Sequence, residues 1–176
     1  MADDDVTGLT VEDGVTGLTV ELEAVAPHDP GTVWDLVTDV DRVHQWSPEC
    51  VETGWVHGDG PHPGGRFTGR NAFLDMEWTV TGEVIEAERP RVFAWKVIDA
   101  GDPADRPSSL GRYELSPAPD GGTLIRQTFT HGVGNSRLRE LIARNPEKAQ
   151  QIIAYRQELL RKNMAETLAA MLDTVS

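Results

Sequence analysis

The stretch Asn145–Val175, NPEKAQQIIAYRQELLRKNMAETLAAMLDTV, decides the fold of this chain. It predicts one long helix, because Asn145 suits a helix N-cap, Pro146 suits the first turn, and no Gly or Pro follows. Apolar residues recur at the spacing of a single buried stripe: Ala149, Ile152, Ile153, Leu160, Met164, Leu168, Met171 and Leu172. The charged residues fall mostly outside the stripe, Arg156 among them. Such a helix would be roughly 40 Å long, so it needs a wide partner surface.

The chain before this helix reads as short strands separated by turns. Alternating apolar and polar residues mark a first strand from Val15 to Ala26 and a half-buried strand at Met76–Glu86. The other expected strands are Val51–Val56, Arg66–Asn71, Arg91–Ile98, Leu110–Leu115 and Thr123–Thr130. Between the first two strands we expect two short helices, one capped by Asp29 and one ending near Trp46, with another at Ser136–Arg144.

This order of elements indicates an α+β protein. Strands and helices do not alternate, so a doubly wound parallel sheet is not indicated. The expected fold is a curved seven-stranded antiparallel sheet around the long C-terminal helix, with two short helices between strands one and two. A curved sheet and a helix leave a space between them, and a ligand would bind there.

The N-terminal region carries a local duplication. The sequence VTGLTVE occurs at Val6–Glu12 and again at Val15–Glu21, which is too few copies for a repeat protein. Only the second copy continues into an alternating strand. We therefore expect residues 1–14 to form an acidic flexible tail and residues 15–176 a single domain. The alternative is that the first copy adds an edge strand.

Composition excludes several classes of partner. The net charge of −13 over 176 residues argues against a nucleic-acid or anionic-membrane surface, because both need clustered Lys and Arg. Cys50 is the single cysteine, so an internal disulfide is impossible and a reducing compartment fits. No apolar run would span a bilayer. We expect a cytoplasmic protein that does not insert into membranes, and favour a monomer, although the oligomeric state is open.

Short motifs are spread along the chain from Pro30 to Met164. They are Pro30-x-x-Val33-Trp34-Asp35, Asp39-Val40-x-Arg42, Trp46-Ser47-Pro48-Glu49, Gly65-Arg66-Phe67-x-Gly69-x-Asn71, Trp78, Tyr113-x-Leu115, Gly121-Gly122-Thr123 and Asn163-Met164. From about Val15 onward the chain resembles the polyketide cyclase/dehydrase branch of the START-like (SRPBCC, helix-grip) superfamily. These motifs are structural rather than catalytic, and the family contains cyclases, aromatases and lipid carriers, so the activity stays open.

The resemblance implies a deep, mostly apolar cavity between the sheet and the long helix. It places the mouth of this cavity among the segments Asn71–Asp75, Asp99–Ser109 and His131–Ser136. The candidate contacts from the inward strand faces and the helix are Trp55, Phe67, Met76, Trp78, Trp95, Phe129, Ile153, Leu160 and Met164. Aromatic faces suit a planar or polycyclic ligand, although ordinary core packing is the alternative for each residue.

Polar residues expected to face inward are the stronger candidates. Tyr113 and Gln127 share the inward parity of their strands, and a buried polar group needs a partner. Asn71 falls at the mouth, where capping a turn is the alternative role. His131 is the candidate general acid or base, with a surface histidine as the alternative. The pair His57 and His62 lacks a third ligand nearby, so we expect a solvated loop without a metal.

Three functions are compatible with these features. The first is binding of a small hydrophobic ligand, planar or polyketide- or lipid-like, without a cofactor. The second is a cyclase or aromatase in which Tyr113, Gln127 or His131 polarises a carbonyl or moves a proton. The third is a protein-interaction domain, which would need a broad exposed apolar patch, and only Phe73-Leu74 suggests one. Few ionisable residues are expected to face inward, which favours binding over catalysis.

Overall fold

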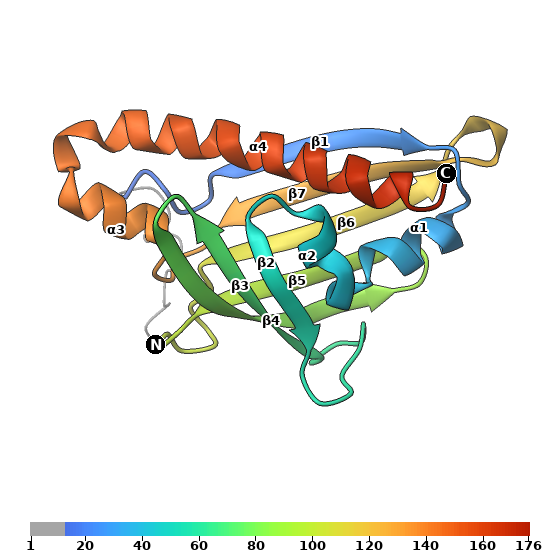
Figure 1. Cartoon of the computed structure of the whole chain (residues 1–176), viewed down its shortest axis with the longest axis horizontal. Coiled ribbons are helices and arrows are strands. Elements are labelled where there is room, and N and C mark those ends of the chain that lie inside the picture. The colour runs from blue at the N-terminus through green and yellow to red at the C-terminus, as the bar shows by residue number, and fades with distance from the viewer. Residues whose placement is uncertain (1–12) are drawn as a thin grey trace, which may run out of the picture.

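The computed structural model describes residues 13–176, and its main feature is one curved antiparallel sheet (Figure 1). The seven strands are β1 (Thr19–Ala26), β2 (Cys50–Trp55), β3 (Arg66–Phe73), β4 (Met76–Glu88), β5 (Val92–Asp99), β6 (Ser109–Pro117) and β7 (Thr123–His131). Their order is β1-β7-β6-β5-β4-β3-β2, so every neighbour except the β1–β7 pair follows directly along the chain. The predicted seven-stranded antiparallel sheet is confirmed.

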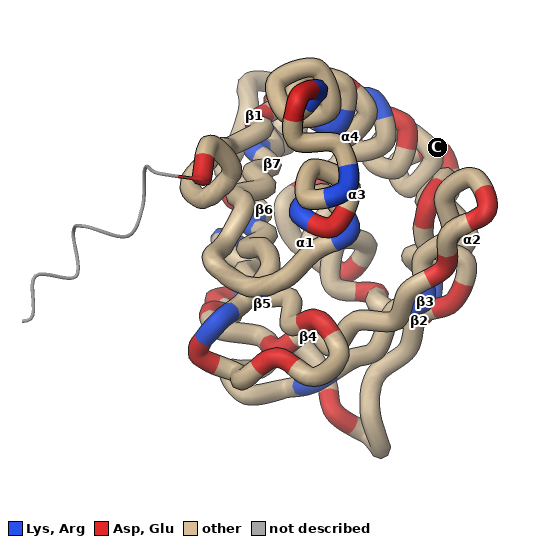
Figure 2. The backbone as a smooth tube through the Cα atoms, turned by 90° about the vertical axis from the view of Figure 1, so that its left-hand side faces the viewer, with Lys and Arg blue, Asp and Glu red and all other residues tan. Residues whose placement is uncertain are grey.

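Helices cover one face of this sheet. They are α1 (Pro30–Val37), α2 (Val43–Trp46), α3 (Arg137–Arg144) and α4 (Ala149–Asp173), with short 3-10 turns η2 (Val40–Arg42), η3 (Pro119–Gly121) and η4 (Pro146–Lys148). Helix α4 contacts β1, α1, α2 and α3. Viewed from the α3 end, the sheet curls from β1 beside α4 around to β2 and β3 on the opposite side (Figure 2). The predicted helices between the first two strands are therefore present.

Local chemistry explains where several helices start. At α1, Asp29 accepts a hydrogen bond from the Thr32 backbone N–H at 3.2 Å, and Pro30 occupies the first turn. At α3, Ser136 accepts from the Arg139 backbone N–H at 3.2 Å. Both caps satisfy N–H groups that a helix start otherwise leaves unpaired.

Most strand boundaries differ from the sequence prediction by one or two residues, and the start of the long helix and the start of the first strand differ by more. The long helix begins as the 3-10 turn η4, and Asn145 makes no side-chain cap there. Its amide instead donates to the Leu141 carbonyl, so it satisfies the end of α3 rather than the start of α4. The first strand begins at Thr19 rather than Val15, because a tight turn in which Leu18 N–H donates to the Val15 carbonyl precedes it.

The predicted tail falls almost wholly outside the described residues, and so does the first VTGLTVE copy at Val6–Glu12. Asp13, at its described end, is tied to the domain. Its carboxylate accepts hydrogen bonds from the backbone N–H groups of Val15 and Thr16, each at 2.9 Å, and from the Arg139 guanidinium at 2.8 Å.

The main core lies where α1 and the C-terminal half of α4 meet the middle strands. Val33 and Trp34 of α1 pack with Phe93 and Ile125 of the sheet and with Met171 of α4. A smaller cluster joins Val20, Leu160 and Met164 further back along α4. The remaining stretch between α4 and the sheet is not filled by core. Within residues 13–176, no helix combines the length and apolar character needed to cross a bilayer.

Candidate functional site

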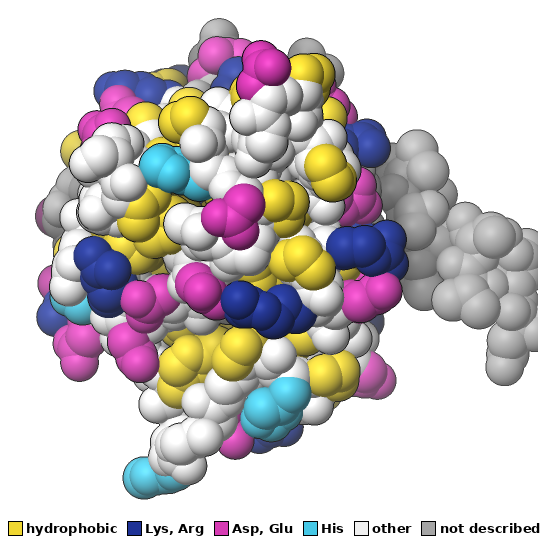
Figure 3. All heavy atoms as spheres, turned by 90° about the vertical axis from the view of Figure 1, so that its right-hand side faces the viewer, with side chains coloured by type: hydrophobic (Ala, Val, Ile, Leu, Met, Phe, Trp, Pro, Cys, Tyr) yellow, Lys and Arg dark blue, Asp and Glu magenta, His cyan; other side chains and the backbone are white. Residues whose placement is uncertain are grey.

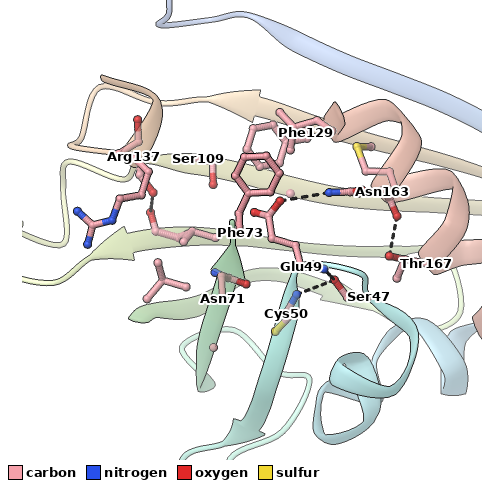
Figure 4. Close-up of a pocket in the computed structure, with 18 of the residues that line it drawn as sticks. Ser47, Glu49, Cys50, Asn71, Phe73, Ser109, Phe129, Arg137, Asn163 and Thr167 are labelled. Carbon is pink, nitrogen blue, oxygen red and sulfur yellow. Dashed lines mark hydrogen bonds between the residues drawn. The ribbon is translucent and has the colours of Figure 1, made fainter. Parts of the chain in front are cut away.

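A cavity of about 380 Å³ lies between the inner face of the sheet and α4. Its walls come from β2 to β7, from α2 and α3, and from one face of α4, so side chains far apart in the sequence meet around it (Figure 4). Most of the lining residues are aliphatic or aromatic, and polar side chains are interspersed among them. This composition is typical of small-molecule sites, in which apolar walls bind and a few polar atoms orient the ligand.

Most of the residues predicted from the sequence as ligand contacts line this cavity. They are Phe67, Asn71, Met76, Trp78, Trp95, Tyr113, Gln127, Phe129, Leu160 and Met164. All three segments predicted for the mouth also contribute lining residues, among them Phe73, Asp99 and His131. The structure shows that these side chains border the cavity. Their role in binding a ligand stays a prediction.

Trp55 and Ile153 do not line the cavity. Trp55 packs edge-to-face on Phe67, with ring centroids 5.6 Å apart, and joins the main core from the end of β2. The alternation of side chains along β2 predicted correctly that Trp55 faces inward. It did not predict whether that inward position borders the cavity or the core. The Ile153 side chain lies beside Gly14, on the flank of α4 where the N-terminal segment passes. The lining instead takes Ile152 and Leu159 from α4.

Stacked aromatic rings form one wall. Trp95 lies between Phe93 and Tyr113, with ring centroids 5.3 Å and 5.7 Å apart and tilted rings. Trp95 also lies directly over Gly111 of the neighbouring strand, where a Cβ atom would meet the indole at 2.3 Å. The glycine therefore creates the space that lets the ring lie against the sheet.

Two buried polar residues face each other in this wall. Tyr113 and Gln127 are paired across β6 and β7, and the Gln127 amide donates to the Tyr113 hydroxyl at 3.0 Å. Burial raises the pKa of Tyr113 well above its ordinary value. The phenol is thus neutral at physiological pH, which makes it a hydrogen-bond donor rather than a base.

His131 lies at the end of β7, is only 4% exposed, and bonds through Nε2 to the Gln157 side chain of α4 at 2.8 Å. The alternative of a surface histidine is therefore wrong. Burial lowers the pKa of His131, and the positive charges of Arg156 and Arg139 lower it further, against an opposing effect of the Gln157 hydrogen bond. The neutral imidazole is the favoured form in the folded protein.

This shift predicts a pH dependence of stability. Because the folded-state pKa is depressed, protonation favours the unfolded chain, so the stability contributed by neutral His131 is lost as pH falls below about 6.5. His131→Gln removes the titrating group and keeps a partner for Gln157. Urea unfolding at about pH 8 and about pH 5 should show the wild type losing more stability on acidification than the variant. Equal losses would show that His131 does not titrate in this range.

The sequence did not predict the charged cluster that joins β2 to α4. Glu49, just before β2, accepts two hydrogen bonds of 2.8 Å from the Arg156 guanidinium and a third of 3.2 Å from the Asn163 amide. Figure 4 shows the Glu49 carboxylate directed toward Asn163 on α4. The Arg156 and Glu49 side chains are 21% and 14% exposed, so this ion pair is largely buried. The expectation that Arg156 lies outside the buried face, and that inward ionisable groups are nearly absent, is corrected.

One signal in the sequence could have located the cluster. Arg156 and Asn163 are two helical turns apart on the same face as Leu160 and Met164, so the polar pair belongs to the edge of the apolar stripe. The other charged residues considered do not join this cluster. His57 and His62 are exposed in the β2–β3 loop, and Arg137 pairs with Glu140 and directs its guanidinium away from the other labelled residues (Figure 4).

Comparisons with known proteins agree with this architecture. Residues 17–167 match the family described as polyketide cyclase / dehydrase and lipid transport. The chain is similar to the solution structure of the polyketide cyclase-like protein Cgl2372 from Corynebacterium glutamicum, with 28% identity, a TM-score of 0.62, and coverage of 91% of this chain and 92% of that one. A search of curated proteins finds no match.

More distant structures share the fold. Protein Ms6760 from Mycobacterium smegmatis is 18% identical, with a TM-score of 0.59 over 90% of this chain and 91% of that one. Ara h 8.0201 is 16% identical, with a TM-score of 0.57 over 90% of this chain and 97% of its own. The family match covers most of the chain, and the structural likeness extends over the same sheet and helix. The chain therefore belongs to the polyketide cyclase/dehydrase and lipid transport family, within the START-like helix-grip superfamily.

Proposed function

We propose that this protein binds a small hydrophobic molecule, planar or polyketide- or lipid-like, in the cavity between the sheet and α4. The observation that carries the proposal is the cavity itself: about 380 Å³, walled mainly by aliphatic and aromatic side chains. A void of this size inside a core that is otherwise closely packed leaves much apolar surface without contacts, and an apolar ligand would supply them.

Native mass spectrometry of the protein purified from its own host tests this directly. The expected result is a mass increment that disappears on denaturation and corresponds to a hydrophobic compound extractable into organic solvent. Repeated recovery of protein with no bound compound, together with failure to bind added apolar compounds, would contradict the proposal.

A cavity-filling variant should separate binding in the cavity from binding on the surface. Val80 on β4 lines the cavity, whereas the adjacent Thr79 is exposed on the other face of the strand. Val80→Phe is expected to weaken binding of the neutral fluorophore N-phenylnaphthylamine by roughly tenfold or more, because the new ring occupies ligand space. Thr79→Phe adds the same ring outside and should leave the affinity unchanged. Fluorescence titration measures both, and equal affinities would place the dye elsewhere.

An enzymatic role is the second candidate, a polyketide cyclase or aromatase using Tyr113, Gln127 or His131. It is favoured by one observation: a neutral phenol donor and a buried imidazole both line the cavity. The phenol could polarise a carbonyl of a folded polyketide chain, and the neutral imidazole could accept a proton from an activated carbon. The test is product analysis after mixing the protein with a reactive poly-β-ketone, since a carrier would leave the distribution of spontaneous products unchanged.

The protein-interaction alternative has less support. Of the two residues Phe73 and Leu74, the first lines the cavity and the second is exposed, with 85% of its surface accessible. On the face shown in Figure 3, hydrophobic side chains are interspersed with acidic and basic ones rather than gathered into one broad patch. A partner-binding surface would need a larger contiguous apolar area.

A further inference from the structure

The Tyr113–Gln127 pair leaves hydrogen-bonding capacity unused inside the cavity. Gln127 is 8% exposed and Tyr113 5%, and the amide N–H of Gln127 donates to the phenol oxygen. Among the residues that the structure describes, the Gln127 carbonyl oxygen has no partner and the Tyr113 hydroxyl proton has no acceptor. A buried acceptor without a partner destabilises a protein by about 1–3 kcal/mol. The unpaired oxygen therefore indicates that a polar group of a ligand binds to this pair.

The unused atoms define what can bind. The hydroxyl of Tyr113 still offers one proton, and the side-chain carbonyl of Gln127 still accepts one. They are adjacent, because the amide nitrogen that contacts the phenol at 3.0 Å is bonded to the same carbon as the free oxygen. Both side chains line the cavity, so the pair places one unused donor and one unused acceptor on neighbouring groups of the same wall.

The complementary ligand group is one that accepts and donates from a single atom. A ketone or an ether would satisfy Tyr113 and leave the Gln127 oxygen unpaired. A carboxylate would meet that oxygen with like partial charge in a site where burial already disfavours charged groups, as the raised pKa of Tyr113 shows. A hydroxyl group satisfies both atoms. An aromatic ring that carries this hydroxyl would extend along the aromatic wall, where Trp95 is stacked on Tyr113.

We propose that the Tyr113–Gln127 pair is a hydroxyl-recognition site, so that the ligand is a neutral apolar alcohol or phenol whose O–H accepts from Tyr113 and donates to Gln127. This rests on the proposed function, because it specifies which hydrophobic molecules the cavity prefers. It also assigns the pair a recognition role, since a phenol with a raised pKa cannot remove a proton from the ligand.

Three naphthalene probes test the site, each titrated into the full-length protein by calorimetry: naphthol, methylnaphthalene, which has nearly the same shape, and the methyl ether of naphthol, which is larger by one methyl group. Naphthol is expected to bind roughly 3- to 10-fold more tightly than the ether, which accepts but cannot donate, and more tightly again than methylnaphthalene. If the three bind equally, the cavity takes apolar ligands and the hydroxyl site is wrong. If none binds, the proposed function fails, and the hydroxyl site fails with it.

Variants assign the preference to these two residues. Gln127→Leu should bring the affinity ratio of naphthol to its ether close to one, because the ether lacks only the donor that Gln127 accepts. Tyr113→Phe should bring the ratio of the ether to methylnaphthalene close to one, because it removes the donor to the ligand oxygen. Methylnaphthalene binding should stay within about twofold of wild type in both variants. Thr123→Val is the matched control, because it removes another buried hydroxyl from β7, bonded to the His28 carbonyl at 2.7 Å and outside the cavity. It should keep both wild-type ratios. If Gln127→Leu keeps the first ratio and Tyr113→Phe keeps the second, the assignment is overturned, and the wild-type series alone decides if a variant does not fold.

Discussion

Replacing Arg156 by methionine is expected to lower the free energy of unfolding by about 3 kcal/mol. The variant keeps the apolar stem of the side chain but leaves the Glu49 carboxylate, whose side chain is 14% exposed, with only the Asn163 amide as a partner. A largely buried carboxylate that loses its cation must be hydrated or protonated, and either change loosens β2 from α4. Urea unfolding at neutral pH measures the loss.

The control is Arg70, an exposed arginine on β3, the strand that pairs with β2. Arg70 pairs with Glu52 at 3.1 Å, but these side chains are 42% and 72% exposed, so Arg70→Met should change stability by less than about 1 kcal/mol. The double variant Glu49→Leu/Arg156→Met should recover most of the loss, because it removes the unpaired charge along with its partner. If Arg156→Met and Arg70→Met lose the same stability, the Glu49–Arg156 pair contributes no more than a surface ion pair.

Adding a methyl group at Gly111 is expected to cause the second large loss of stability. Gly111→Ala places a Cβ atom 2.3 Å from the Trp95 indole, a distance at which the ring must move. Forcing atoms into a filled space destabilises a core by about 2 kcal/mol, and here the displaced ring would enter the cavity. The variant should therefore show both a lower unfolding midpoint and weaker binding of N-phenylnaphthylamine.

Gly60→Ala provides the comparison, because a Cβ at that loop glycine meets nothing within 4 Å. It should leave stability unchanged or raise it by a few tenths of a kcal/mol. Trp95→Leu removes the ring that the new methyl group would strike, so its combination with Gly111→Ala should lose less than the sum of the two single changes. Additive losses would mean that the ring and the glycine are independent.

The sequence predicted the fold well because the fold is encoded locally. Alternation in strands such as β4, the Asp29 cap before α1 and the apolar stripe of α4 are each visible within a window of a few residues. The errors lie at boundaries. Asn145 can cap either of two helices, and its choice of the Leu141 carbonyl depends on how α3 and α4 meet, which sequence periodicity does not describe.

The candidate site was predicted in part, for a related reason. Parity identified Tyr113 and Gln127 as inward, and the structure places them in register with each other. The alternation of side chains shows which face of the sheet a residue lies on, but not whether that part of the face borders the cavity or the core. For this reason Trp55 was predicted to line the cavity, although it joins the core. Helical periodicity likewise placed Ile153 on the inner stripe, whereas its flank of α4 lies beside Gly14.

By itself the sequence determined the elements, their order and the apolar character of the space they enclose, because hydrophobic periodicity and helix capping act between near neighbours in the chain. Only the tertiary structure decided which charges enter that space. Glu49 and Arg156 are 107 residues apart, and neither has a local reason to be buried. They can be buried because the curvature of the sheet brings the start of β2 against α4, where each ion neutralises the other. The tertiary structure also decides that the side-chain oxygen of Gln127 has no partner among the described residues. The β6–β7 register places Tyr113 opposite Gln127, and the Tyr113 hydroxyl pairs with the amide nitrogen rather than with the oxygen.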